Sequence, residues 1–144
     1  IFPFLDQIPI NDHDNSTRNF KKEFILEVLP KLMITIIYYI MDEKKHASVR
    51  NIRLLTHIHS IFLYCLRKFP ELTEHIKNHL TKFIENEDGE QNKTTNLGCI
   101  LALLSGVDSH KYSDIVEAYF SEQLDRQVLW ILKAVPELND ESIQ

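Results

Sequence analysis

The sequence has 144 residues, of which 44% are hydrophobic and 26% are charged, and its formal net charge is −5 at pH 7. A chain of this length has room for one hydrophobic core, and its 3 Gly and 5 Pro are too few for a turn-rich all-β fold. The negative net charge argues against a dedicated nucleic-acid binder, because such proteins draw much of their affinity from a dominant basic face.

The N-terminal stretch "IFPFLDQIPI" is apolar but has no helical period. We interpret residues 1–17 as an N-terminal arm or linker, and residues 18–144 as a helical domain that is a segment of a larger protein. Nothing in the chain resembles a signal peptide. A cytoplasmic or nuclear location is therefore expected.

A first helix is predicted from residue 18. Four apolar residues recur there at four-residue steps: Phe20, Phe24, Val28 and Leu32. Pro30 is expected to kink or divide this helix. Residues 32–41 contain one polar side chain, Thr35, and charged residues lie on both sides of this run. Ten residues are too few for a membrane span of about 20.

The same run, residues 32–41, is rich in β-branched and aromatic side chains, which also suit a buried strand. No strand of similar character occurs elsewhere in the chain. We therefore expect a helix that is apolar nearly all round and is packed between neighbours on every side.

Ser48 is expected to cap a second helix that ends at Pro70, and Pro70 then opens a third helix as a first-turn proline. Five residues form one apolar face of the second helix: Ile52, Leu55, Ile58, Phe62 and Cys65.

The polar segment 85–95, "ENEDGEQNKTT", has no apolar anchor and is expected to be a mobile, exposed turn. A fourth helix is predicted over residues 96–106, with small residues that allow close approach of a neighbour. A fifth helix is expected to start at Ser109 or Ser113. A sixth is expected over residues 125–135, before Pro136.

Two segments resemble HEAT and armadillo repeats, whose period is about 40 to 47 residues. In "VLPKLM" followed by "MDEKKHASVRNIRLL", the residues matching the HEAT pattern are Pro30, Asp42, Val49 and Arg50. The segment "LTKFIENEDGEQNKTTNLGCILALLSG" is similar to an armadillo helix pair. This resemblance implies an all-α, HEAT/armadillo-like α-solenoid of about three antiparallel helix pairs. It also implies a non-catalytic protein–protein interaction or scaffold module.

A second family has a slighter resemblance to the chain. "NLGCILALLSG" is similar to the "NWGR" core-helix motif of Bcl-2-type death regulators, with Cys99 in place of the motif's arginine and Leu97 in place of its tryptophan. This alternative implies a compact helical bundle that wraps around residues 97–104 and binds partner helices.

An internal match suggests where a partner binds. "LYCLRKFPELTE", residues 63–74, aligns without gaps to "LWILKAVPELND", residues 129–140, which predicts that a helix ends in the same way twice. Tyr, Trp and Arg are the residues most enriched at interface hot spots. The predicted partner-binding residues are Arg53, His57, Tyr64, Arg67, Trp130 and Lys133, although core packing of both aromatics remains an alternative.

Catalytic, cofactor and metal sites are not predicted. Glu71, His75 and His79 share one helical face, but no second helix obviously supplies a fourth ligand. Cys65 and Cys99 lie in apolar runs without C-x-x-C spacing, so buried free thiols are expected. The chain also lacks a nucleophile elbow and a glycine-rich phosphate loop. We therefore expect a non-enzyme without cofactor, with a protein or a neighbouring domain as partner, and with no nucleic-acid or membrane partner.

Overall fold

The computed structural model describes residues 15–42 and 48–139, and all regular structure in these two ranges is helical. The α-helices are α1 (Asn15–Met41), α2 (Val49–Lys68), α3 (Pro70–Glu85), α4 (Glu90–Lys93), α5 (Gly98–Leu104) and α6 (Tyr112–Ala134), and the 3₁₀ helices are η1 (Glu87–Gly89) and η2 (Pro136–Asn139). The predicted all-α class is confirmed. Most of the arm predicted for residues 1–17 lies outside the described residues, and its last three residues already belong to α1.

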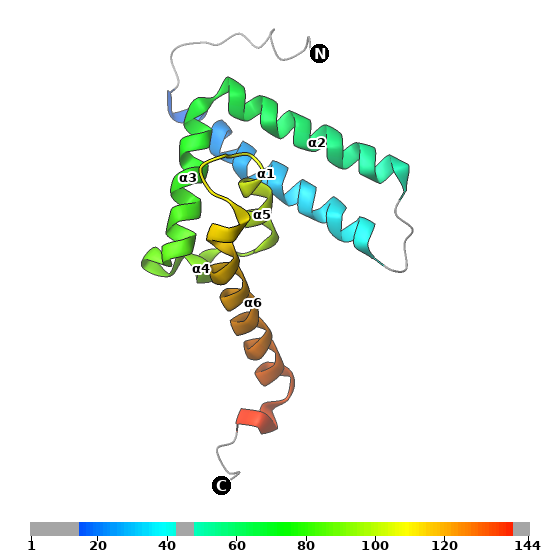
Figure 1. Cartoon of the computed structure of the whole chain (residues 1–144), viewed down its shortest axis with the longest axis vertical. Coiled ribbons are helices and arrows are strands. Elements are labelled where there is room, and N and C mark those ends of the chain that lie inside the picture. Colours follow the sequence, from blue (N-terminus) through cyan, green and yellow to red (C-terminus); the bar gives the residue numbers. More distant parts are fainter. Residues whose placement is uncertain (1–14, 43–47, 140–144) are drawn as a thin grey trace.

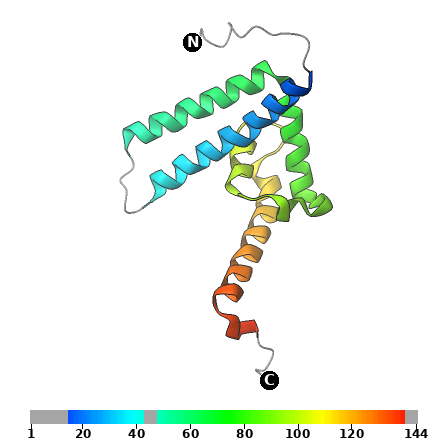
Figure 2. The same cartoon turned by 180° about the vertical axis from the view of Figure 1, so that it is seen from behind.

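Helices α1 and α2 lie side by side as an antiparallel hairpin (Figure 1, Figure 2). Ser48 caps α2 as predicted, because its Oγ accepts a hydrogen bond from the Asn51 backbone N–H at 3.2 Å. This bond satisfies one of the N–H groups that a helix start leaves without a partner. Phe62 and Leu66 of α2 are buried in the core.

Residues 32–41 form the last turns of α1 and contain no strand, but the expectation that they are buried on every side is wrong. Met33 and Ile34 are buried, whereas Tyr38 and Met41 are 62% and 73% exposed. Helices α2 and α5 cover α1 on its inner side, and the outer end of the hairpin extends beyond the other helices (Figure 1). One side of these turns therefore faces solvent.

Pro30 is fully buried within α1 and does not divide the helix. The window Phe24–Met41 is long and apolar enough to cross a membrane by length and composition alone, which differs from the sequence-based expectation that the apolar run is too short. Within the structure, partly buried side chains of this window, among them Leu26 and Ile37, pack against the core.

Helix α3 crosses the hairpin and contacts α1, α2, α5 and α6. Pro70 opens it in the first turn as predicted, where the missing N–H of proline costs no helical hydrogen bond. Its inner face consists of Leu72, Ile76, Leu80 and Phe83, each at most 1% exposed. Burial of one such side chain contributes about 1.5–3 kcal/mol, so this face is the centre of the core.

Most residues of the segment 85–95 are exposed, as predicted, but the segment forms the short helices η1 and α4 rather than a turn, and polar groups anchor it. Asn86 adopts a left-handed conformation with φ 51° and ends α3. The Gln91 side-chain Nε2 donates a hydrogen bond to the Phe83 carbonyl at 2.8 Å, and the Gln91 backbone N–H donates to Asn86 Oδ1 at 3.2 Å. These anchors are amide and backbone groups, so hydrophobic periodicity gives no sign of them.

Helix α5 and the turn after it lie close to α1 and α2, as predicted from the small residues in this segment. A Cβ atom on Gly98 would lie 3.0 Å from Ile34 Cγ2 in α1, and one on Gly106 would lie 2.7 Å from Phe62 Cε1 in α2. Helix α5 has seven residues, all of them buried or half-buried, and its main contacts are with α1 and α3. The Bcl-2-type alternative stays a prediction.

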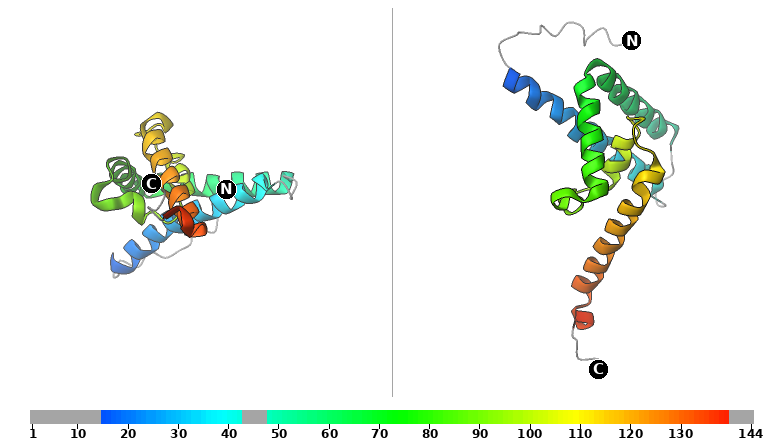
Figure 3. Two further views of the ribbon diagram at one scale, coloured as in Figure 1. Left: turned by 90° about the horizontal axis from the view of Figure 1, so that it is seen from below. Right: turned by 60° about the vertical axis from the view of Figure 1, so that its left-hand side comes forward.

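The predicted fifth and sixth helices are one continuous helix, α6, of 23 residues. The residues between the two expected helices, 121–124, contain no Gly or Pro, so no breaker interrupts the helix. The predicted third antiparallel pair is therefore absent from the described residues. The N-terminal half of α6 packs near α3, and its C-terminal half extends away from the other helices (Figure 1, Figure 3).

Candidate protein interface

From residue 120 to its C-cap at residue 135, α6 exposes a continuous apolar stripe. Its five members are 40–63% exposed and recur at steps of four, four, three and four residues: Phe120, Leu124, Val128, Ile131 and Val135. This spacing places them on one helix face. We refer to these five residues as the α6 stripe.

The face that carries the α6 stripe has no charge between residues 120 and 135. At 3.6 residues per turn, the charged residues of this segment fall on other faces of the helix; they are Glu122, Asp125, Arg126 and Lys133. Glu117 precedes the stripe on the same face. The α6 stripe is therefore an uncharged apolar surface with one carboxylate at its N-terminal end.

Arg126, on the opposite side of α6, joins this helix to the segment 85–95. Its Nε donates to Glu122 Oε1 at 2.6 Å, and its Nη2 donates to the carbonyls of Gln91 at 2.8 Å and Thr94 at 2.6 Å. Its Nη1 donates to the Thr95 carbonyl at 3.3 Å. These carbonyls lie at the C-terminal end of α4, where a helix leaves acceptors without intrahelical partners, so Arg126 caps α4 from a distant part of the chain.

Helices α2 and α6 end in the same way, as the internal match predicted. Phe69 ends α2 with φ −126° and ψ 82°, and Val135 ends α6 with φ −129° and ψ 79°. Each backbone N–H donates to the carbonyl four residues earlier, of Cys65 and Ile131, at 2.9 Å. Each of these residues precedes a proline, which disfavours continuation of the helix. The repeated helix end is confirmed.

The surroundings of the two helix ends differ. Leu72 in the first aligned segment and Phe62 directly before that segment are at most 1% exposed. At the corresponding positions of the second end, Leu138 and Val128 are 58% and 52% exposed. At the first end, α1 runs antiparallel to α2 and covers it (Figure 2). No helix of the described residues does the same for the end of α6.

The outer face of α2 is basic. It carries four of the predicted partner-binding residues, namely Arg53, His57, Tyr64 and Arg67, of which Tyr64 is half-buried and the others are exposed. The Lys68 Nζ lies 5.9 Å from the centre of the Tyr64 ring, within the range of a cation–π contact. Helix α2 contains no Asp or Glu, so nothing within the helix neutralises this face.

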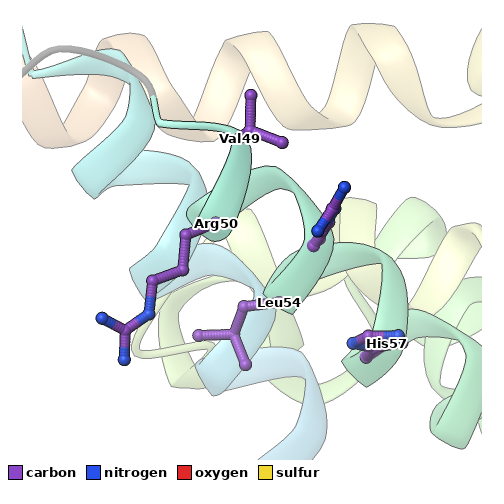
Figure 4. Close-up of a pocket in the computed structure, with 5 residues that line it drawn as sticks. Val49, Arg50, Leu54 and His57 are labelled. Atoms are coloured by element: carbon purple, nitrogen blue, oxygen red, sulfur yellow. The ribbon is translucent and has the colours of Figure 1, made fainter.

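An open hollow of about 430 Å³ lies at the start of α2. It is lined by Val49, Arg50, Arg53, Leu54 and His57 (Figure 4). Guanidinium groups recognise carboxylates through paired hydrogen bonds, and the aliphatic side chains offer apolar contact. The hollow therefore suits an acidic segment that also carries apolar side chains.

The structure does not bring the predicted binding residues of α2 and α6 onto one surface. Trp130 is 65% exposed and Lys133 is also exposed, so the alternative that Trp130 is a core residue is wrong. The two lie on the half of α6 that extends away from α2 (Figure 3). The sequence analysis did not identify the α6 stripe, because it divided α6 into two helices. The spacing of the five apolar residues would indicate the stripe in a single continuous helix.

Metal binding has little support in the described part of the chain, where no three His, Cys, Asp or Glu side chains are placed to hold an ion. Two of the three candidate ligands on α3 have other partners. Glu71 pairs with Lys22, and this hydrogen bond lowers the pKa of the Glu71 carboxyl. His79 Nδ1 lies 3.3 Å from Glu90 Oε1.

Neither the two thiols nor the contact between Ser105 and His59 forms an activated nucleophile. Cys65 and Cys99 are free and half-buried rather than buried, and burial raises the pKa of each thiol, which lowers its reactivity. The Ser105 hydroxyl lies 3.1 Å from His59 Nε2 but donates its proton to the Ala102 carbonyl at 2.6 Å. His59 must therefore donate to Ser105, which is the reverse of a general-base arrangement.

No protein-family model, curated protein or solved structure matches the chain. The surfaces described above are therefore the basis for a functional proposal.

Proposed function

We propose that the chain is a non-catalytic protein-interaction module of a larger intracellular protein, and that it binds a partner helix along the α6 stripe. One observation carries the proposal: five apolar side chains are 40–63% exposed on an uncharged helix face. Extended apolar surfaces on soluble domains usually mark contacts with another molecule. Amphipathic helices bind partners by placing such a stripe against an apolar surface.

We propose the outer face of α2 as a second contact surface, directed at an acidic segment of the partner. Its exposed Arg53, His57 and Arg67 have no carboxylate within α2 to pair with. Complementary charge of this kind raises the association rate and fixes the orientation of the partner more than it adds affinity. The half-buried Tyr64 would supply the apolar part of this contact.

A HEAT- or armadillo-like array of helix pairs is the architecture that we propose for the larger protein. The antiparallel hairpin α1–α2 and the recurrence of one helix end at residues 69 and 135 support this proposal. In such arrays each unit covers the apolar face of the next unit. An uncovered helix end is therefore expected wherever the neighbouring unit comes from another molecule or another part of the chain.

Site-specific photo-crosslinking in cells tests the proposal. A photoreactive residue at position 124 or 128 replaces a stripe residue, and one at position 125 or 129 lies outside the stripe. We expect strong adducts from Leu124 and Val128 and weak adducts from Asp125 and the exposed Leu129, because helix pairing contacts one face only. Each adduct is identified by mass spectrometry.

Equal adducts at all four positions would indicate random collision. No adduct at any position would indicate that no partner contacts this part of α6. Either outcome contradicts the proposed binding face. Circular dichroism on each variant verifies that the helix content is unchanged. This control is expected to hold because Leu124 and Val128 are at least half exposed.

A further inference from the structure

We propose that the partner of the α6 stripe is α6 of a second copy of this chain, packed antiparallel across a two-fold axis between Gln127 and Val128. This inference rests on the proposed function of the stripe and names its partner. Three observations support it: the spacing of the stripe, its lack of charge, and the way in which the matching helix end is covered.

The spacing of the α6 stripe is self-complementary. Turning the helix about the midpoint between residues 127 and 128 places Phe120 opposite Val135 of the second copy, and Leu124 opposite Ile131 of the second copy. The large Phe120 then meets a smaller β-branched side chain, and Val128 meets Gln127. A two-fold interface requires such a match, because the same surface serves both copies.

The lack of charge on this face also suits a second copy. Two identical copies present the same charges to each other. A net charge at the centre of the face would therefore be repelled by the same charge on the second copy. Between residues 120 and 135 the face carries none, and Glu117 lies at its end. The basic outer face of α2 lacks this property, since two copies of it would repel each other.

The matching helix end shows the direction in which a covering helix runs. At the end of α2, the covering helix α1 is antiparallel to it (Figure 1). Helix α6 of a second copy, related by the two-fold axis, would also run antiparallel. It would cover Val128, which matches the buried Phe62.

The size of the contact predicts a weak dimer. Each stripe side chain is about half exposed, so pairing would remove roughly 80 Å² per side chain and roughly 800 Å² in total, below the usual size of a stable interface. We therefore expect a dissociation constant in the micromolar range rather than a permanent dimer.

Sedimentation equilibrium on the purified chain tests the dimer directly, over roughly 1 to 500 μM. Leu124→Glu and Ile131→Lys should each weaken the dimer at least about 100-fold, because two copies of the unpaired charge are buried in each dimer. Mixing these two variants should restore association to within about tenfold of the unchanged chain. In the antiparallel register the carboxylate introduced at position 124 of one copy lies opposite the ammonium introduced at position 131 of the other, and the second contact between positions 124 and 131 stays apolar.

A matched control is Leu32→Glu, which replaces a leucine of α1 that is 43% exposed and lies outside both proposed contact surfaces. It should leave the association unchanged. Circular dichroism is expected to show an unchanged fold for all three variants, since each replaced residue is exposed.

Three results would overturn the inference. A chain that stays monomeric throughout the concentration range has no partner in its second copy. A dimer that Leu32→Glu disrupts uses the hairpin instead, and a dimer that the mixture does not restore has another register. If the chain is monomeric but positions 124 and 128 still form adducts with a different protein, the proposed function stands and the second-copy partner fails.

Discussion

Arg126→Ala should destabilise the chain more than any other substitution of a charged residue on α6. The change removes hydrogen bonds to Glu122 and to the carbonyls of Gln91, Thr94 and Thr95. It also leaves the Glu122 carboxylate, whose side chain is 6% exposed, without its partner. Removing one member of a buried ion pair costs about 3–5 kcal/mol.

The Arg126 side chain is 29% exposed, so water can replace some of the lost hydrogen bonds. The loss in unfolding free energy is therefore at the lower end of this range. We expect a loss of about 3 kcal/mol in the free energy of unfolding, which corresponds to about 10 °C in Tm for a chain of this size. Arg126→Lys should recover only part of this loss, because an ammonium cannot span the carbonyls as the planar guanidinium does.

Urea denaturation measures the loss, and hydrogen exchange over residues 91–95 locates it. Both should change in Arg126→Ala, whereas the exposed Lys133→Ala should stay within about 0.5 kcal/mol of the unchanged chain. If Arg126→Ala also falls within that limit and the exchange over residues 91–95 is unaltered, Arg126 does not hold α6 to α4.

Three other predictions follow from burial and close packing. Gly106→Ala should cost about 1–3 kcal/mol by thermal denaturation, because the added methyl group would meet Phe62; an unchanged Tm would mean that α5 can shift freely. Trp130→Ala should change the free energy of unfolding by less than about 0.5 kcal/mol, since the side chain is 65% exposed; a Tm loss of several degrees would place it in a core. Cys65 and Cys99, whose thiol pKa values are raised by burial, should react with iodoacetamide at pH 8 at least about tenfold more slowly than in the denatured chain; equal rates would show that neither is shielded.

The local parts of the fold could be predicted from the sequence because their causes lie within a few residues. Ser48 precedes an apolar helix and caps it, and Pro70 has the fixed φ that suits a first turn. The repeated end at Phe69 and Val135 follows from a proline in the next position. In each case the residue type that allows the prediction is itself part of the helix start or helix end that it predicts.

The parts that could not be predicted depend on contacts between distant residues. Arg126 lies four residues after Glu122, a spacing that suggests an ordinary surface ion pair. Its main partners, however, are backbone carbonyls 31 to 35 residues earlier. Backbone carbonyls are the same at every position, so no residue type marks them. The exposure of residues 32–41 escaped prediction for a similar reason, since periodicity shows that a side chain is apolar but not whether a neighbour reaches it.

The Arg126 contact also gives α6 the mechanics of a lever. The helix is held at this point, and it continues for eight residues to Ala134, about 12 Å at 1.5 Å per residue. A tilt of about 10° at the held point would therefore move the free end by about 2 Å. A partner, a salt or a modification could alter the hydrogen bonds between the Arg126 guanidinium and the three carbonyls. Such a change would alter the direction of the exposed half of α6 without disturbing the core.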